Sequence, residues 1–554
     1  MAMLLISTVK VKAEDVPSID DPTPGYYETS EYMIGSVAVG IILPESNGSS
    51  DPETENWTPE EIEIVKNQTQ SALNWWKLQN PNATVSFINE TNIMVPTSYE
   101  PVNQLSNRSS WVNDVMTYLG YPSLGRHYKY QVRDYVNDLR HRRNTDWAFA
   151  IFVIDNSNET DKVLGDSNQG GPAVYMSYSA GIYGTDNMHR PCAHEIGHIF
   201  WAAEEKTADI YYQGYLNVAN DPESDCLMGV NNTLKLSGAP HGDYGTWGQV
   251  GWHDNDTDTI QDIVDTFQSV YINSSTITGN KMQYNGTATV IPYPNNNNKT
   301  NNPSGKRDVT INNITSIQYR IDNDAWSSDV TITSWNVTRL IRYPNINETR
   351  PTNATVDFNF TVDLTSLLPG NYTVEVKATN QWNISGYATS IFYLNTVISI
   401  TNVAANKTVI SVKVNNTGSS TVNTSVSVAW KHIDPTQNVT LPPGETTLNF
   451  VNWETNPTGH YEITAVTDVV IINSSVYIGF YINKTVSFGV GGSQAGQSDS
   501  TSNWVALAFC MLSASFIAPE FSKKKKPDDD LLTATEHNDS TENMWQNLAR
   551  HQLT

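Results

Sequence analysis

The sequence predicts a multidomain protein: an α/β (or α+β) domain first, two all-β sandwich domains after it, and a C-terminal transmembrane helix. Three observations predict this order. Strand and helix patterns alternate over residues 35–203, which indicates an α/β or α+β domain of about 230 residues. Short alternating runs then recur at regular spacing over residues 307–488, as in β-sandwiches. Residues 504–519 form an uncharged apolar run, which a block of lysines follows.

Length and composition set the first limits. The chain has 554 residues, enough for about three or four domains at roughly 150 residues each. It contains 33 Lys and Arg against 58 Asp and Glu, a formal net charge of −25. Nucleic-acid binding requires a basic face, so this balance argues against nucleic acid as a partner. Cys192, Cys226 and Cys510 are too few for a disulfide scaffold or a four-cysteine zinc site.

The first domain is predicted to span residues 32–292. Residues 146–154 are nearly all apolar and indicate its central strand. Residues 58–79 indicate a helix, because Thr58 can cap it and Pro59 suits its first position. The other expected elements are strands at 35–43, 83–91 and 173–183, and helices at 109–119, 128–143 and 190–203.

An Asn- and Pro-rich linker at residues 293–306 precedes the two predicted sandwiches, 307–395 and 396–488. The second resembles the cell-adhesion-related (CARDB-type) β-sandwich modules of prokaryotic surface proteins, through residues 412–418, 441–445 and 459–461. The first resembles Ig-like domains, through residues 319–322 and the turn at 370–372. Neither shows catalytic residues, so the resemblance implies spacers.

Both ends of the chain suggest targeting. Residues 1–31 are predicted to be a signal remnant and leader, because an apolar stretch precedes small residues. After a Gly/Ser-rich linker at 489–503, the run 504–519 would rise about 24 Å as a transmembrane helix. Lysines 523–526 would hold the tail, 520–554, in the cytoplasm. Many Asn-x-Ser/Thr sequons also suit a surface glycoprotein. We therefore expect a single-pass cell-membrane protein, with its large N-terminal part extracellular.

One motif carries chemistry: His194-Glu195-Ile196-Gly197-His198, an HExxH sequence. On a helix, His194 and His198 lie on one face, where two imidazoles can bind one zinc ion. Glu195 can then act as the general base toward a zinc-activated water that attacks a peptide bond. A buried pair of structural histidines is the alternative, although burying Glu195 beside them without compensation would be costly.

The motif and its following residues resemble the metzincin class of zinc peptidases, whose pattern is HExxHxxGxxH or HExxHxxGxxD. The resemblance implies a third zinc ligand ten residues after the first histidine, which is Glu204 here, with Glu205 as the alternative. Trp201 stands where the family has the glycine of a tight turn. A carboxylate at Glu204 is nevertheless a competent zinc ligand.

The same resemblance gives roles to a later segment. Met228, in Asp225-Cys226-Leu227-Met228-Gly229, resembles the methionine turn beneath the metzincin metal. Cys226 would then be able to form a disulfide with Cys192 in an oxidising location, the alternative being two buried free thiols.

A second metal signal follows at residues 254–265. Its carboxylates fall at positions 1, 3, 5, 9 and 12, the spacing of oxygen-ligand calcium loops. It resembles the DxDxDG loops of extracellular calcium-binding repeats, with Thr259 at the glycine position. A solvated acidic loop is the alternative. The candidate calcium ligands are Asp254, Asp256, Asp258, Asp262 and Asp265.

These features predict a cell-surface zinc metalloendopeptidase, a hydrolase acting on peptide or protein substrates outside the cell. Zinc is the expected cofactor and calcium a second candidate. The alternative is a non-catalytic surface adhesion or surface-layer protein, in which the HExxH site is a relic or a structural metal site. An open coordination position favours the enzyme, and four protein ligands would favour the alternative.

Overall fold

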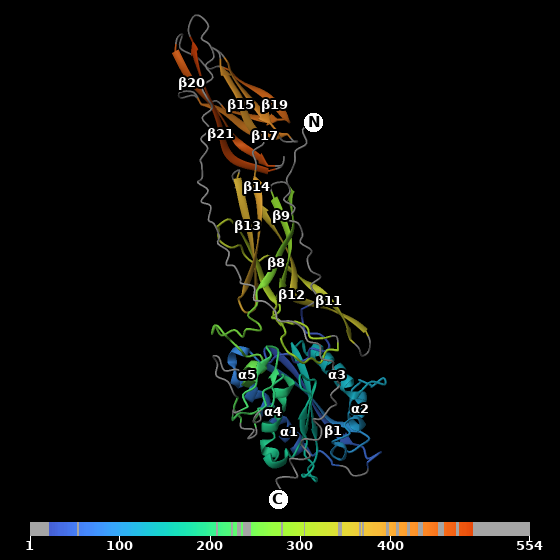
Figure 1. The fold of residues 1–554 in the computed structure, drawn as a ribbon. Helices are drawn as coiled ribbons and strands as arrows, with labels where there is room; N and C mark the ends of the chain where they lie inside the picture. The colour runs from blue at the N-terminus through green and yellow to red at the C-terminus, as the bar shows by residue number, and fades with distance from the viewer. Residues whose placement is uncertain are drawn as a thin grey trace, which may run out of the picture.

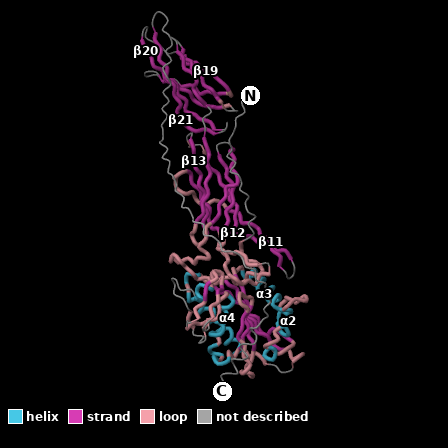
Figure 2. The backbone as a smooth tube through the Cα atoms, viewed as in Figure 1, coloured by secondary structure: helices cyan, strands magenta, loops and turns pink. Residues whose placement is uncertain are grey.

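The computed structural model describes residues 22–51, 55–205, 209–222, 225–229, 234–236, 245–278, 281–303, 305–341, 346–364, 367, 370–394, 398–405, 409–417, 421–429, 436–451, 459–472 and 476–490. Figure 1 shows three units in a row, of which only the N-terminal one contains helices. The two units beyond it are built of strands, as Figure 2 also shows.

The N-terminal unit is built on a five-stranded sheet of order β2-β1-β3-β5-β4. Strands β2, β1, β3 and β5 run parallel, and β4 is an antiparallel edge strand beside β5. The predicted central strand is confirmed, because β3 is in the middle of the order and buried along its length. The strands are β1 (Ser36–Ser46), β2 (Ser86–Thr97), β3 (Trp147–Ile154), β4 (Gly165–Ser167) and β5 (Ala173–Ser177).

Helices cover both faces of this sheet. In β3, Phe149 and Ile151 join the core under α1 (Pro59–Gln79) and α4 (His189–Ile199). Phe152, on the opposite face, joins the core under α2 (Ser109–Tyr118) and α3 (Tyr128–Arg143). Successive side chains of a strand point to opposite faces, which explains why a fully apolar β3 serves both cores.

Local sequence sets where α1 begins. Thr58 Oγ1 accepts a hydrogen bond from the Glu61 amide, and the Glu61 carboxylate accepts one from the Thr58 amide at 2.9 Å. Pro59 occupies the first turn, where no helical donor is needed. The predicted cap at Thr58 and proline position are therefore confirmed.

Two sheets form the second unit, of orders β10-β13-β14 and β11-β12-β9-β8, and they share one apolar core. The third unit also has two sheets, of orders β15-β16-β19 and β18-β17-β20-β21. Their strands are β8 (Gln268–Thr278), β9 (Lys281–Val290), β10 (Ile314–Ile321), β11 (Ile332–Ile341), β12 (Ile346–Asp363), β13 (Gly370–Asn380), β14 (Ser385–Leu394), β15 (Ile398–Ala405), β16 (Val409–Asn416), β17 (Val422–Ala429), β18 (Thr436–Leu441), β19 (Gly444–Val451), β20 (Gly459–Ile472) and β21 (Val476–Val490).

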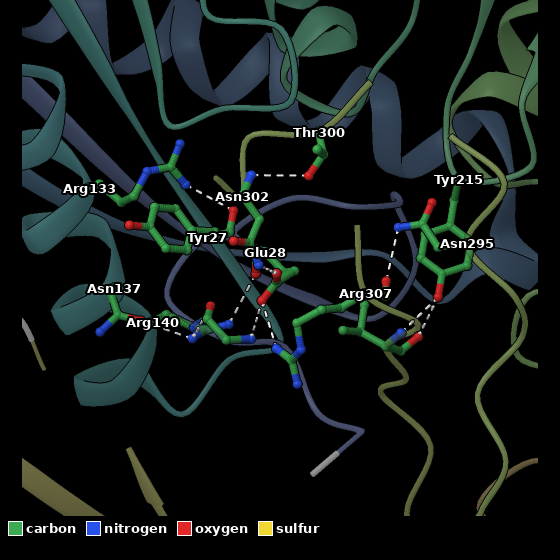
Figure 3. A network of polar contacts seen from close by, with 12 residues as sticks. Tyr27, Glu28, Arg133, Asn137, Arg140, Tyr215, Asn295, Thr300, Asn302 and Arg307 are labelled. Carbon is green, nitrogen blue, oxygen red and sulfur yellow. Dashed lines mark hydrogen bonds and ion pairs between the residues drawn. The ribbon is translucent and has the colours of Figure 1, made fainter. Parts of the chain in front are cut away.

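The boundary between the first two units differs from the predicted one. The β8–β9 hairpin falls within the predicted first domain, 32–292, but β9 pairs with β12 of the second unit. The predicted linker, 293–306, instead returns to the N-terminal unit. There Arg307 forms an ion pair with buried Glu28 at 2.9 Å, and Asn302 donates to the same carboxylate (Figure 3). Periodicity predicts strands but not their partners, which explains the difference.

The predicted fold class, an α/β metzincin-like domain with two sandwiches and a C-terminal transmembrane helix, is wrong for the chain as a whole. Its described residues are mostly β-strands in several sheets, with few helices. No helix within the described ranges is long and apolar enough to cross a bilayer, so the expected single-pass membrane location is not supported. The predicted span 504–519, the segments 1–21, 491–503 and 520–554, and Cys510 lie outside the described residues.

Candidate metal centre

Helix α4 carries the HExxH motif and is anchored through its apolar face. Cys192, Ala193 and Ile196 lie in the core between the sheet and α1. The Trp76 indole of α1 donates a hydrogen bond to the Ala193 carbonyl at 2.8 Å. Because the apolar side of α4 faces this core, His194 and His198 share the side that faces away from it.

The chain reverses directly after α4. Trp201 adopts a left-handed backbone, with φ of 71°, and the Ala202 amide donates back to the Gly197 carbonyl at 3.0 Å. A bulky residue is strained there by roughly 1–2 kcal/mol. Its ring is buried against Gly170, where an added Cβ would come within 2.2 Å of Trp201 Cζ2. The tight turn that the sequence left in question at Trp201 is therefore made by tryptophan.

This turn brings Glu204 back to the two histidines. Glu204 Oε1 lies 3.6 Å from His194 Nε2 and 3.4 Å from His198 Nε2, and the two Nε2 atoms are 3.2 Å apart. The Glu204 carbonyl accepts a hydrogen bond from Asn220 at 2.9 Å, which holds its backbone. Of the candidate zinc ligands, His194, His198 and Glu204 thus converge.

The three ligand atoms fit a zinc ion. Ligands at about 2.0–2.1 Å in a tetrahedron stand about 3.3–3.4 Å from one another, close to the three separations above. The Nδ1 atoms of His194 and His198 each lie 2.7 Å from a backbone carbonyl, of Leu227 and Ala202. Each Nδ1 therefore carries the proton, and each Nε2 is left with a free lone pair. Two such lone pairs 3.2 Å apart can share a proton, as in an ordinary hydrogen bond, or bind one metal ion between them.

Charge in the metal-free site is shared between imidazole and carboxylate. Burial lowers the pKa of His198, but Glu204 outweighs this effect and raises the pKa to about 9. Burial would raise the pKa of Glu204, yet the two histidines hold it well below its usual range. The site is thus electrostatically suited to bind a positive charge next to a carboxylate.

Glu195 lies beside the ligands without being one. Its carboxylate is 5% exposed and accepts a hydrogen bond from Ser167 Oγ at 2.7 Å. Burial raises its pKa, while His194, His198 and the Ser167 hydrogen bond lower it. Ser167 belongs to the edge strand β4, so the base is positioned at the margin of the sheet. No sequence signal marks Ser167, because the contact spans 28 residues and depends on the tertiary fold.

Glu205, the alternative ligand, points elsewhere. It is 1% exposed, and its carboxylate accepts hydrogen bonds from Cys226 Sγ and, at 2.9 Å, from Thr246 Oγ1. Its amide donates to the Met228 carbonyl. Glu205 therefore fastens the chain after the turn to the segment that carries Met228.

The predicted disulfide between Cys192 and Cys226 is wrong, since both residues are buried thiols that are not bonded to each other. Cys226 donates to Glu205, whereas Cys192 packs into the core, where burial raises its thiol pKa to about 12. Met228 lies beneath α4, and an added Cβ on Gly197 would come within 2.7 Å of its sulfur. Packing, rather than a covalent bond, thus supports the motif.

The structure brings together part of the predicted calcium loop. Asp254, Asp256 and Asp258 each place a carboxylate oxygen within 4.8 Å of the others. Asp262 is instead engaged by His253 Nδ1 at 3.0 Å and by the Asn255 amide. Asp265 is outside the group of three, although burial and the neighbouring aspartates raise its pKa.

Comparison with known proteins identifies no family, because no family model and no curated protein matches the chain. Among solved structures, it is similar to latent PorU from Porphyromonas gingivalis (11% identity, TM-score 0.15, covering 41% of this chain and 21% of that one). It is similar to a DUF4785 family protein from Legionella pneumophila (12% identity, TM-score 0.14, covering 40% of this chain and 55% of that one). It is also similar to catalytically inactive OgpA from Akkermansia muciniphila, in complex with an O-glycopeptide substrate (10% identity, TM-score 0.19, covering 68% of this chain and 96% of that one). The chain spans about a fifth of PorU and about half of the Legionella protein. Such low TM-scores carry no argument about this chain.

Proposed function

We propose that this chain is a zinc-dependent metallopeptidase. The observation that carries the proposal is the spacing of His194, His198 and Glu204, whose ligand atoms lie 3.2–3.6 Å apart. Two nitrogens and one carboxylate oxygen are a donor set that zinc prefers. Three protein ligands leave one coordination position for chemistry, which distinguishes catalytic from structural zinc sites.

A zinc ion bound there supplies Lewis acidity, lowering the pKa of a water to about 7 and polarising the substrate carbonyl. Glu195 is the general base of this proposal: it accepts a proton and returns it to the leaving amine. Ser167 holds the Glu195 carboxylate by its hydrogen bond, which limits the conformations available to the base. The carbonyls of Leu227 and Ala202 keep both imidazoles in the ligand tautomer.

Strand β4 supports a peptide as the substrate class. It is the outer strand of the sheet, and no further strand within the described ranges pairs with it. An extended peptide can add to such an edge through main-chain hydrogen bonds. Because Ser167 in β4 contacts Glu195, a peptide bound along this edge would pass next to the general base.

The test is Glu195→Gln in the full chain, with Glu60→Gln, on the exposed first turn of α1, as the matched control. We expect Glu195→Gln to keep one zinc per chain, measured by elemental analysis, and to hydrolyse a quenched-fluorescence peptide library about 10²–10⁴-fold more slowly. His198→Ala should lose the zinc. Undiminished hydrolysis in Glu195→Gln would refute the mechanism. A fully zinc-loaded wild type that cleaves nothing would favour a non-catalytic metal site.

A further inference from the structure

The second acidic cluster lies between α5 (Gly245–Gln249) and β8. The carboxylates of Asp254, Asp256 and Asp258 come together on one short loop. No lysine or arginine forms an ion pair with them within the part of the chain that the structure describes. Three negative charges at this separation repel one another, and a cation bound between them would remove that repulsion.

One oxygen in this cluster points to a ligand. Asp254 is 8% exposed; its Oδ2 accepts a hydrogen bond from the Thr259 amide at 3.0 Å, and its Oδ1 is buried with no hydrogen-bond partner. A buried carboxylate oxygen that has lost its water is costly unless a charge or a donor replaces that water. This oxygen belongs to the residue that already approaches Asp256 and Asp258 to within ligand distance.

In Asp256 and Asp258, a backbone amide also holds one of the two carboxylate oxygens. Asp258 Oδ1 accepts from the Ile260 amide at 2.8 Å, and Asp256 Oδ1 from the Asp258 amide at 3.4 Å. Each carboxylate is therefore oriented by the backbone through one oxygen and keeps the other for a cation. Thr259 holds a φ of 80°, which a β-branched residue rarely adopts. Its amide thereby reaches Asp254.

We propose that Asp254, Asp256 and Asp258 bind a calcium ion. An all-oxygen set of carboxylates suits a hard cation, and calcium tolerates the irregular geometry of a flexible loop better than magnesium does. Three carboxylates from one loop, with water completing the shell, place the expected Kd at about 10⁻⁴–10⁻³ M, as in extracellular modules. The proposal is independent of the peptidase activity and of the zinc site.

The ion would organise the passage between the first two units. The Asp262 amide donates to the His253 carbonyl at 2.8 Å, closing the loop. Beyond it, the Val264 carbonyl accepts from Asn312 Nδ2 at 2.7 Å, and Asn312 Oδ1 accepts from the Trp382 indole of the second unit at 2.8 Å. A calcium ion that orders residues 254–258 would therefore also order Val264, through which the first unit contacts Asn312.

The test is calcium titration by calorimetry of the zinc-loaded full chain, in excess magnesium. The variant is Asp256→Asn/Asp258→Asn, both exposed. The matched control is Asp324→Asn/Asp329→Asn, which removes the same charge from exposed positions of the second unit. We expect one calcium site in the wild type and in the control, and at least a tenfold weaker one in the variant. Calcium at about 100 times the wild-type Kd should raise Tm by about 5–10 °C in the wild type and the control, and by no more than about half as much in the variant.

Two further measurements keep the result interpretable. In a calcium chelator, the variant should have a Tm at least as high as that of the wild type, because two of the three mutually repelling charges are gone; this shows that the variant folds. His198→Ala should bind calcium as the wild type does, which separates this site from the zinc centre. Absence of a calcium site in the wild type, or an equal loss in the control variant, would overturn the proposal.

Discussion

Two adjacent glutamates allow metal binding to be separated from packing. We predict that Glu204→Gln weakens zinc binding about 10²–10⁴-fold, whereas Glu205→Gln leaves it within about tenfold. Glu204 Oε1 lies within 3.6 Å of both ligand nitrogens, while the Glu205 carboxylate is occupied by Cys226 and Thr246. Removing the charged partner of a buried ionic group costs about 3–5 kcal/mol, which gives the expected range in Kd.

The cost of Glu205→Gln should appear in folding instead. Its carboxylate is buried and accepts two side-chain hydrogen bonds, and an amide can replace only one acceptor oxygen. A buried donor left unsatisfied costs about 1–3 kcal/mol, so the free energy of unfolding should fall by that amount. Glu204→Gln should therefore lower zinc affinity, whereas Glu205→Gln should lower the free energy of unfolding, although the two positions are adjacent in the chain.

The assay is competition with a zinc chelator of known affinity, alongside urea unfolding of the metal-free proteins. Both substitutions remove one negative charge, so each serves as the other's control for net charge. If Glu205→Gln loses zinc and Glu204→Gln keeps it, the geometric assignment of the third ligand is refuted. Equal losses in both variants would show that packing of the turn, rather than ligation, determines affinity.

Two pH-dependent predictions follow from buried groups. In the metal-free protein, the folded pKa of His198 is about 9 against an ordinary 6.5, so the stability it contributes is complete below pH 6.5 and lost as pH rises through 9. The Tm difference between wild type and Glu204→Gln should shrink over that range, and a constant difference would contradict it. Burial first, and Glu28 second, raise the pKa of Glu31 from 4.5 to about 8, so this residue destabilises the fold increasingly as pH rises between those values. Glu31→Gln should thus match the wild type below about pH 4.5 and exceed its unfolding free energy by several kcal/mol above pH 8, at about 1.4 kcal/mol per pKa unit. Equal stability at both ends would refute the second prediction.

Local signals predicted the parts of the site that depend on local geometry. The cap at Thr58, and the shared face of His194 and His198, follow from helix spacing alone. Glu204 followed from its offset in the motif, and the structure brings it to the ligand position. The doubt over Trp201 came from its bulk, and the structure resolves it through the close approach of Gly170.

Features that depend on distant partners were not predictable in the same way. The Ser167 contact with Glu195 has no sequence signature, because it requires β4 to lie next to α4. The predicted first domain, 32–292, included residues 281–290, and no local signal shows that β12 is the neighbour of β9. The predicted disulfide was wrong because two cysteines near one motif need not face one another, and Cys226 instead faces Glu205.

The path of the chain between the first two units has a mechanical consequence. It leaves the N-terminal unit for the β8–β9 hairpin, returns over residues 293–312, where Val309 and Tyr215 share a hydrogen bond, and leaves again into β10. Two units connected at several points cannot swivel freely about a single bond. One proteolytic cut within residues 293–312 would leave them joined through the hairpin, and a pulling force would be divided among parallel connections.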